Sequence, residues 1–336
     1  MFKRKKKSRV ILLIILIFIL LILVFSFLFE KRAIKINALE EKYLEIKKQK
    51  EYEKKLKEER EAIYNDCINS PYKDEEVDEM FTNLLNQLNS NDIAIYFEDL
   101  NNNYSLTLNV DKSYYGASLI KLFVASYLID NAREGNIDLN DKIVYTHNYS
   151  IVDTVELKNY KVNDEIPLSD LLKYSISVSD NAAHFMLFDY IGANNLKAYA
   201  KNKFDVNLTI SDSNKYSYLT VSDTNTLLNY IYELINIDDE YSELLVNAMN
   251  NTFCNGLNFD DITFLHKYGY YEQFYHDIGI YNSEDPYLIS IFTTYGKEDR
   301  SHISKLSDVS KKIYEIYDLN LNKKQDYCEN LALNHK

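Results

Sequence analysis

A serine and a lysine lie three residues apart at the start of a long apolar segment that runs from Gly116 to Leu128. On a helix, this spacing places Ser118 and Lys121 on one face, one turn apart. The neighbouring residues are mostly apolar, which is typical of a helix enclosed on most sides. Burial disfavours the charged form of a lysine, and a neutral amine can accept the proton of a serine hydroxyl. The pair therefore indicates a candidate nucleophile with its base, although a capping serine and a lysine that reaches solvent would explain the same residues.

Two further polar motifs follow along the chain. The first, Ser179-Asp180-Asn181, lies between two apolar helical segments, where Asp and Asn also serve as ordinary turn and cap residues. The second, His266-Lys267-Tyr268-Gly269, lies near the end of a predicted strand and precedes Tyr270. A lysine and a glycine two apart on a strand share one face, and the glycine allows a ligand or another backbone to approach. Together these motifs offer a second hydroxyl and a cation beside the candidate nucleophile.

The elements that must position these motifs can be read from hydrophobic periodicity. It predicts an amphipathic helix over 74–88, a hairpin of strands 93–97 and 104–108, and the helix that opens at Gly116. Helical patterns then dominate, and strand patterns return near the end of the chain. These later segments are helices over 168–176, 182–191 and 224–235, strands over 262–267, 277–281 and 287–293, a strand-like run over 206–210, and a last helix over 303–317. Strands at both ends around a helical middle predict an α+β fold, with one antiparallel sheet and its terminal helices beside an all-helical lobe.

Composition restricts the possible partners and cofactors. The formal net charge is −13, and the residues after the basic N-terminal cluster are more acidic still, which argues against a nucleic-acid partner. Three cysteines form no disulfide framework by themselves and lack metal-ligand spacing. The histidines show no i, i+4 pairs with acidic neighbours, so we expect no metal and no cofactor. These histidines are His147, His184, His266, His276, His302 and His335.

The N-terminal part of the chain has the pattern of a membrane anchor. Residues 1–9 are basic and residues 10–29 are apolar apart from Ser26, a length that spans a bilayer as a helix. The basic cluster predicts a cytoplasmic N-terminus and an extracellular remainder, in a single-pass protein of the cell membrane. A cleaved signal peptide is the alternative, but no small-residue cleavage site follows the apolar run. Residues 30–70 are rich in Lys and Glu and predict a helical stalk, which would be a spacer or a weak coiled coil. We expect a folded domain over 71–322 and a C-terminal tail over 323–336.

In order, Ser-x-x-Lys, Ser-Asp-Asn and Lys-Tyr-Gly resemble the three signatures of the class A β-lactamases and penicillin-binding proteins. The segments 171–178, 276–280 and 288–293 are similar to the family's sequences around these motifs, so the resemblance covers about Asp74 to Asn320. It implies a five-stranded antiparallel sheet with flanking helices plus an all-helical lobe. It also implies an enzyme that forms an acyl intermediate on a serine.

The resemblance assigns a role to each motif residue. Ser118 would be the acylated nucleophile, Lys121 its proton acceptor, and Ser179 the group that passes a proton to the leaving nitrogen. Asn181 would bind the substrate amide and help position Lys121, and Lys267 would supply positive charge toward a substrate carboxylate. Tyr268, Gly269 and Tyr270 would contact the substrate, with the backbone N–H groups of Ser118 and Tyr270 forming the oxyanion hole.

Two departures from the family pattern affect the expected activity. The middle residue of the third motif is Tyr268, where the family has Thr or Ser. Arginine is the usual bidentate partner of a carboxylate, and the domain has only Arg133 and Arg300. Both features argue against the usual binding of a substrate carboxylate. The loop 211–219 is short and holds no glutamate to activate a deacylating water; Asp212 is its only carboxylate. We therefore expect a hydrolase that acts on β-lactams or peptidoglycan stem peptides and deacylates slowly. A catalytically degenerate domain that binds a cell-wall ligand or a protein partner is the alternative.

The resemblance also bears on the cysteines. In this fold the first and last helices lie side by side, so Cys67 and Cys328 are candidates for a disulfide, although isolated free thiols explain them equally well.

Overall fold

The structure is a computed structural model that describes residues 2–102, 104–297 and 300–335. The chain forms two compact units: one contains the residues up to Ile68 together with those from Tyr327 onward, and the other contains Asn69–Asp326.

The larger unit is built on a five-stranded antiparallel sheet with strand order β2-β1-β9-β8-β7. The first two strands form the predicted hairpin, and the last three follow one another through the C-terminal half. The strands are β1 (Ile93–Asp99), β2 (Tyr104–Leu108), β7 (Leu265–Tyr271), β8 (Phe274–Tyr281) and β9 (Tyr287–Thr293). Two small antiparallel pairs accompany the sheet: β3 (Tyr114–Tyr115) with β6 (Tyr218–Leu219), and β4 (Lys142–Val144) with β5 (Glu165–Pro167).

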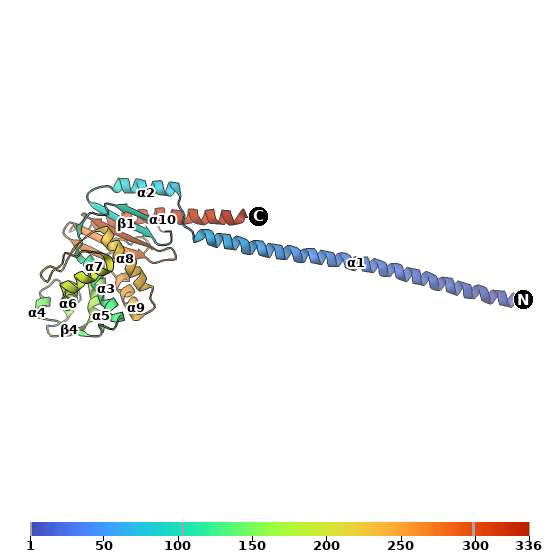
Figure 1. Cartoon of the computed structure of the whole chain (residues 1–336), viewed down its shortest axis with the longest axis horizontal. Helices are drawn as coiled ribbons and strands as arrows, with labels where there is room; N and C mark the ends of the chain where they lie inside the picture. The colour runs from blue at the N-terminus through green and yellow to red at the C-terminus, as the bar shows by residue number, and fades with distance from the viewer. Residues whose placement is uncertain (1, 103, 298–299, 336) are drawn as a thin grey trace. The chain divides into compact units, whose positions relative to one another are not determined.

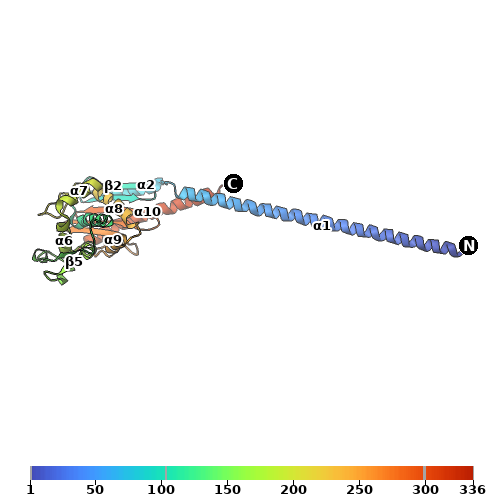
Figure 2. The same cartoon turned by 60° about the horizontal axis from the view of Figure 1, so that its bottom comes forward.

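The sheet separates two hydrophobic cores (Figures 1 and 2). One face packs against α2 (Glu75–Leu88) and the first half of α10 (His302–Leu333), through Phe81, Phe97 and Tyr317 among others. Asp74 caps α2 by accepting the backbone N–H of Val77 at 3.1 Å, which explains why the helix begins there. The opposite face packs against the helical lobe, so the predicted α+β architecture is confirmed.

The helical lobe surrounds one buried helix, α3 (Ile120–Arg133), which follows a 3₁₀ turn, η1 (Ala117–Leu119). Its other elements are α4 (His147–Ser150), η2 (Leu157–Asn159), α5 (Leu168–Ser177), α6 (Asn181–Ile191), α7 (Ala193–Phe204), α8 (Val221–Ile235) and α9 (Glu240–Asn250).

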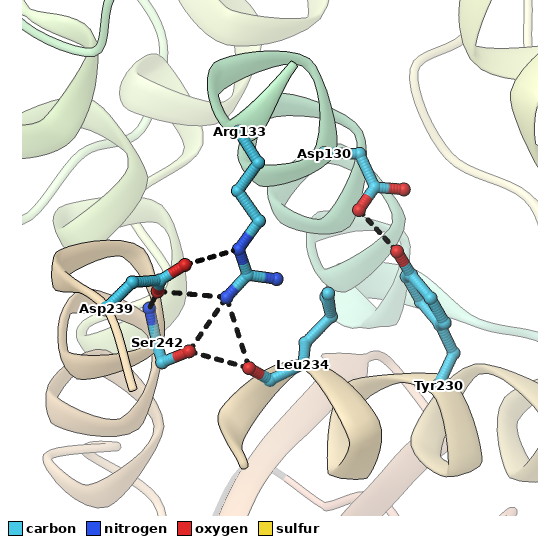
Figure 3. Close-up of polar contacts among 6 residues, drawn as sticks. All are labelled: Asp130, Arg133, Tyr230, Leu234, Asp239 and Ser242. Atoms are coloured by element: carbon cyan, nitrogen blue, oxygen red, sulfur yellow. Dashed lines mark hydrogen bonds and ion pairs between the residues drawn. The ribbon is translucent and has the colours of Figure 1, made fainter. Parts of the chain in front are cut away.

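Polar contacts fix the C-terminal end of α3 against α8 and α9 (Figure 3). Arg133 donates to both carboxylate oxygens of Asp239, at 2.7 and 3.0 Å. It also donates to the carbonyl of Leu234 at 3.1 Å and to the hydroxyl of Ser242 at 2.7 Å. One turn earlier, Asp130 accepts a hydrogen bond from the hydroxyl of Tyr230. Helix α3 is therefore held in place at the end opposite to Ser118.

Several predicted bounds are wrong; β8 and α8, for example, each begin three residues earlier than predicted, at Phe274 and Val221. Residues 206–210 form no strand, because the N–H of Thr209 donates to the side chain of Ser217 and not to a neighbouring strand. Strand β7 begins at Leu265, because Ile262 closes a turn with Phe259, and it continues to Tyr271, so Lys267 lies near its start. The last helix continues past Tyr317 to Leu333.

The smaller unit contains α1 (Phe2–Ile68), one unbroken helix (Figure 1). Cys67 forms a disulfide with Cys328, with their Cα atoms 5.6 Å apart, and Cys254 is a free thiol. Of the two open possibilities for Cys67 and Cys328, the structure therefore has the disulfide. Among the described residues, one helix, α1, is sufficiently long and apolar to serve as a membrane anchor or a signal sequence.

Candidate functional site

Ser118 lies in η1, immediately before α3, and only 8% of its surface is exposed. The preceding residue, Ala117, has a φ of 45°, in the left-handed region that residues with a Cβ rarely adopt. Such a conformation costs roughly 1–3 kcal/mol and is found most often at functional sites. The chain is therefore strained at the position of the candidate nucleophile.

Lys121 is fully buried on the first turn of α3. Its Nζ donates to the carbonyl of Ser179 at 2.7 Å, to the hydroxyl of Ser179 at 3.1 Å and to Oδ1 of Asn181 at 2.8 Å. Burial, and then the charge of Lys267, lower the pKa of Lys121 well below its usual value, against the opposing effect of Asp180 and Asp153. Loss of its proton near neutral pH is therefore easier than for an exposed lysine, as a general base requires.

Ser179 lies on the turn between α5 and α6, where its φ is 56°. The next residue, Asp180, is buried and caps α6 by accepting the N–H of Ala183 at 2.9 Å. Its other carboxylate oxygen accepts hydrogen bonds from the side chain of Thr154 and from three successive backbone N–H groups, those of Val155, Glu156 and Leu157, at 2.8–3.1 Å. Burial alone would raise the pKa of Asp180, but these hydrogen bonds outweigh it and lower the pKa. Asp180 thus fixes both the Ser179–Asn181 turn and the loop that contains Thr154.

Lys267 lies on β7 and is fully buried. Its Nζ donates to the carbonyl of Tyr268 at 3.1 Å and lies 4.2 Å from the centre of the Tyr268 ring. Burial lowers the pKa of Lys267 to about 7, although Asp277 and Cys254 act to raise it. Burial likewise raises the pKa of Tyr268, whose hydroxyl interacts with the side chains of Cys254 and Ser179. The phenol ring therefore occupies the immediate surroundings of the cation that was expected to face a substrate carboxylate.

Gly269 is the position at which β7 approaches the nucleophile most closely. A Cβ at this residue would lie 2.6 Å from the carbonyl oxygen of Gly116 and 3.4 Å from the nitrogen of Ser118. No larger residue fits at the first of these distances without a shift of the backbone. The predicted role of this glycine, close approach of another backbone, is what the structure shows.

A cavity of about 360 Å³ opens beside Ser118. The described residues that line it are Tyr115, Ala117, Ser118, Asp153, Asn181, Tyr216, Tyr270, Tyr271 and Glu272. Of the predicted site residues, Ser118, Asn181 and Tyr270 line the cavity itself. Lys121 donates hydrogen bonds to both Ser179 and Asn181, and the side chain of Tyr268 interacts with that of Ser179.

Sequence reasoning assigned no role to five polar or aromatic residues of the cavity: Tyr115, Asp153, Tyr216, Tyr271 and Glu272. The tyrosines near the motifs were noticeable, but the abundance of tyrosine, 30 in the chain, makes such groupings common by chance. Asp153 and Glu272 lie in loops outside any motif, and nothing in the local sequence distinguishes them. Their place at the cavity depends on the tertiary fold.

A sequence model of the beta-lactamase enzyme family matches residues 76–317. The chain belongs to this family. No match was found among proteins with curated descriptions.

Solved structures of family members have a similar fold. The extended-spectrum beta-lactamase TLA-1 aligns at 20% identity with a TM-score of 0.62, over 72% of this chain and 99% of that protein. PBP-A aligns at 20% identity with a TM-score of 0.64, over 71% and 96%. A beta-lactamase from Chitinophaga pinensis aligns at 17% identity with a TM-score of 0.62, over 71% and 98%. At these identities the likeness establishes the fold, and the chemistry must be argued from this family member's own residues.

Proposed function

We propose that this protein is an extracytoplasmic serine hydrolase that forms an acyl-enzyme with β-lactams or with the peptide stems of peptidoglycan. The observation that carries the proposal is the buried amine of Lys121, three residues after Ser118 in the chain and hydrogen-bonded to Ser179 and Asn181. One similar solved structure is a PBP-A variant in an acyl-enzyme complex with penicillin G. It aligns with this chain at 19% identity and a TM-score of 0.62. This supports a β-lactam as the first ligand to test.

The acylation step can be written with this chain's own groups. The Oγ of Ser118 attacks the substrate carbonyl while Lys121, in its neutral form, accepts the hydroxyl proton. The carbon–nitrogen bond then breaks, and the hydroxyl of Ser179 passes a proton to the leaving nitrogen and regains one from Lys121. The product is an ester on Ser118, with Asn181 binding the substrate amide and the N–H groups of Ser118 and Tyr270 stabilising the oxyanion.

Deacylation should be slow, because the loop 211–219 contributes a phenol to the cavity and holds no glutamate to activate a water. Tyr216 is the described residue of this loop that lines the cavity, and its hydroxyl donates to Oδ1 of Asn181 at 3.2 Å. Burial raises the pKa of Tyr216, so the phenol keeps its proton and cannot act as a base. General-base help is worth about 10²–10⁴-fold in rate, and its loss should let the acyl-enzyme accumulate.

Two features support an extracytoplasmic placement, anchored by the N-terminal helix. The basic residues before the apolar segment favour retention of the N-terminus in the cytoplasm. The Cys67–Cys328 disulfide fits an oxidising compartment.

Labelling with a fluorescent penicillin, followed by mass spectrometry of the adduct, tests the proposal. We expect a long-lived adduct on Ser118 and no labelling of Ser118→Ala. Ser126→Ala is the matched control, because Ser126 is a fully buried serine on α3, the helix that follows Ser118, and is outside the residues that line the cavity; its variant should label normally.

Two results would contradict the proposal in different ways. Rapid hydrolysis without a detectable adduct would show that another group, Asp212 or Lys121, activates the water. No adduct with any β-lactam or peptide ester would favour the degenerate domain that only binds its ligand.

A further inference from the structure

We propose that the cavity beside Ser118 selects acyl substrates that carry an ammonium group, and that it disfavours substrates with an additional carboxylate. The inference rests on the proposed acyl-enzyme chemistry and specifies which substrates it accepts. It follows from the charges and aromatic rings that line the cavity.

The described lining residues include two carboxylates, Asp153 and Glu272, and neither a lysine nor an arginine. The two carboxylates come from separate segments, the loop before η2 and the turn between β7 and β8. Both residues are exposed, and both line the cavity. A ligand at this site therefore meets two negative charges.

Several cations of the larger unit are engaged in other contacts. Lys121 donates to Ser179 and Asn181, and Lys267 lies under the ring of Tyr268. Lys215, the residue before Tyr216, pairs with Asp189. None of the described residues that line the cavity is an arginine or a lysine that could offset Asp153 and Glu272.

Aromatic rings complete a surface suited to a cation. The centre of the Tyr115 ring lies 5.2 Å from that of Tyr271 and 6.1 Å from that of Tyr216, and all three residues line the cavity. A tyrosine face attracts an ammonium ion, and groups of such rings bind quaternary and methylated ammonium ligands in other proteins. Carboxylates beside the rings strengthen that attraction and repel anions.

The surface is held in place by buried contacts. The N–H of Thr293 donates to Nδ1 of His276 at 3.1 Å, which leaves Nε2 to donate to the carbonyl of Tyr115 at 2.9 Å. Burial lowers the pKa of His276 to about 4, so this neutral form persists at neutral pH. Asp180 also accepts hydrogen bonds from the side chain of Thr154 and from the N–H of Val155, the two residues that follow Asp153. The cavity therefore needs little rearrangement to bind a cation.

Three penicillins provide a matched test, because they share the nucleus and the phenyl ring and differ at one side-chain carbon. Benzylpenicillin carries hydrogen there, ampicillin an ammonium and carbenicillin a carboxylate. We expect second-order acylation rate constants in the order ampicillin, benzylpenicillin, carbenicillin, with about tenfold between the first and last at low salt. High salt should reduce the difference, because both carboxylates are exposed.

Variants assign the effect to its residues. The double variant Asp153→Asn, Glu272→Gln should bring the ampicillin-to-carbenicillin ratio close to one. Asp212→Asn is the matched control, because it removes an exposed carboxylate of the neighbouring loop that does not line the cavity, and the ratio should not change.

Failure of this inference can be distinguished from failure of the proposed function. Equal rates for the three penicillins, with a normal Ser118 adduct, would overturn the ammonium preference and leave the hydrolase intact. If no adduct forms at all, the proposed function fails. Calorimetric binding of ampicillin and carbenicillin to Ser118→Ala then decides the charge preference by itself: tighter binding of ampicillin supports it, and equal or reversed binding overturns it.

Discussion

Tyr268 changes what Lys267 can do. In the expected arrangement this lysine offers its charge to the carboxylate of a substrate, with a small hydroxyl residue beside it. Here the ammonium group lies 4.2 Å from the centre of a phenol ring, and its hydrogen bond goes to the backbone of the same tyrosine. A single side chain therefore changes the surroundings of Lys267, the residue expected to face a substrate carboxylate.

Replacing Tyr268 with threonine should return Lys267 to the substrate. Removal of the ring admits water, which raises the pKa of Lys267 above its value of about 7 and opens a path to the cavity. We expect faster acylation by benzylpenicillin, by about tenfold, because a hydrogen bond to a charged group is worth about 1.5–3 kcal/mol. Stopped-flow measurement of the acylation rate constants of Tyr268→Thr and the wild type with benzylpenicillin tests this prediction. Tyr268→Phe is the control, since it keeps the ring and should show no gain; a gain in both variants would contradict this explanation.

The pH dependence of acylation should report Lys121. Only the neutral amine accepts the Ser118 proton, so the rate constant should be low in acid and rise to a plateau as pH passes the pKa of Lys121. Burial and the charge of Lys267 lower that pKa well below 10.5, so the plateau should be reached at a correspondingly lower pH than for an exposed lysine. Lys121→Arg cannot lose its proton and should slow acylation by about 10²–10⁴-fold. A rate that still rises above pH 10 would argue against Lys121 as the base.

At the scale of elements, α3 connects the site to the rest of the helical lobe. Its first turn contains Lys121, and its last turn ends in Arg133, which binds Asp239, Leu234 and Ser242 (Figure 3). The hydrogen bond from Arg133 is the main cause that lowers the pKa of Asp239 to about 2. The pair consequently joins α3 to the start of α9.

We expect Arg133→Lys to destabilise the domain by about 1–2 kcal/mol, because lysine cannot make the two parallel hydrogen bonds to the carboxylate. The pH dependence gives a second readout. Since the pKa of Asp239 is lowered in the folded state, its contribution to stability is complete above about pH 4 and is lost as pH falls toward 2. Denaturant titrations at pH 7 and pH 3 measure both effects. Equal stability of the variant and the wild type at pH 7 would show that the network contributes nothing.

Sequence patterns predicted some of the elements better than others. Elements with a strong apolar period were predicted well: the strand 287–293 has the predicted bounds, and the helix 74–88 begins one residue later, after its cap. The strand-like run 206–210 has an alternating pattern, but its inward side chains are buried without a strand partner, and local pattern cannot distinguish these cases. The motif residues were found because their chemistry is local. Asp153 and Glu272 were not found, because only the fold brings their loops to the cavity.

At the scale of the whole molecule, the disulfide joins Cys67 to a residue 261 positions later, so nearly all of the larger unit lies between the two linked cysteines. A protease site inserted in the exposed turn 282–284, between β8 and β9, tests this linkage. After cleavage, the two fragments should migrate together on a gel without reductant and separate when reductant is added. In the Cys67→Ser, Cys328→Ser variant they should separate in both conditions. Separation of the wild-type fragments without reductant would show that the bond does not form.

The same bond turns the polypeptide between Cys67 and Cys328 into a closed ring. One cut anywhere in a ring opens it without detaching any part, so a protease that clips a single surface loop leaves every candidate site residue covalently attached to α1. One cut frees the entire ring from the apolar residues of α1 only if it falls before Cys67, in the exposed helical segment that follows them. If the apolar residues are retained as a membrane anchor, proteolysis in the exposed helical segment that follows them would convert a membrane-bound protein into a diffusible one with its cavity unchanged.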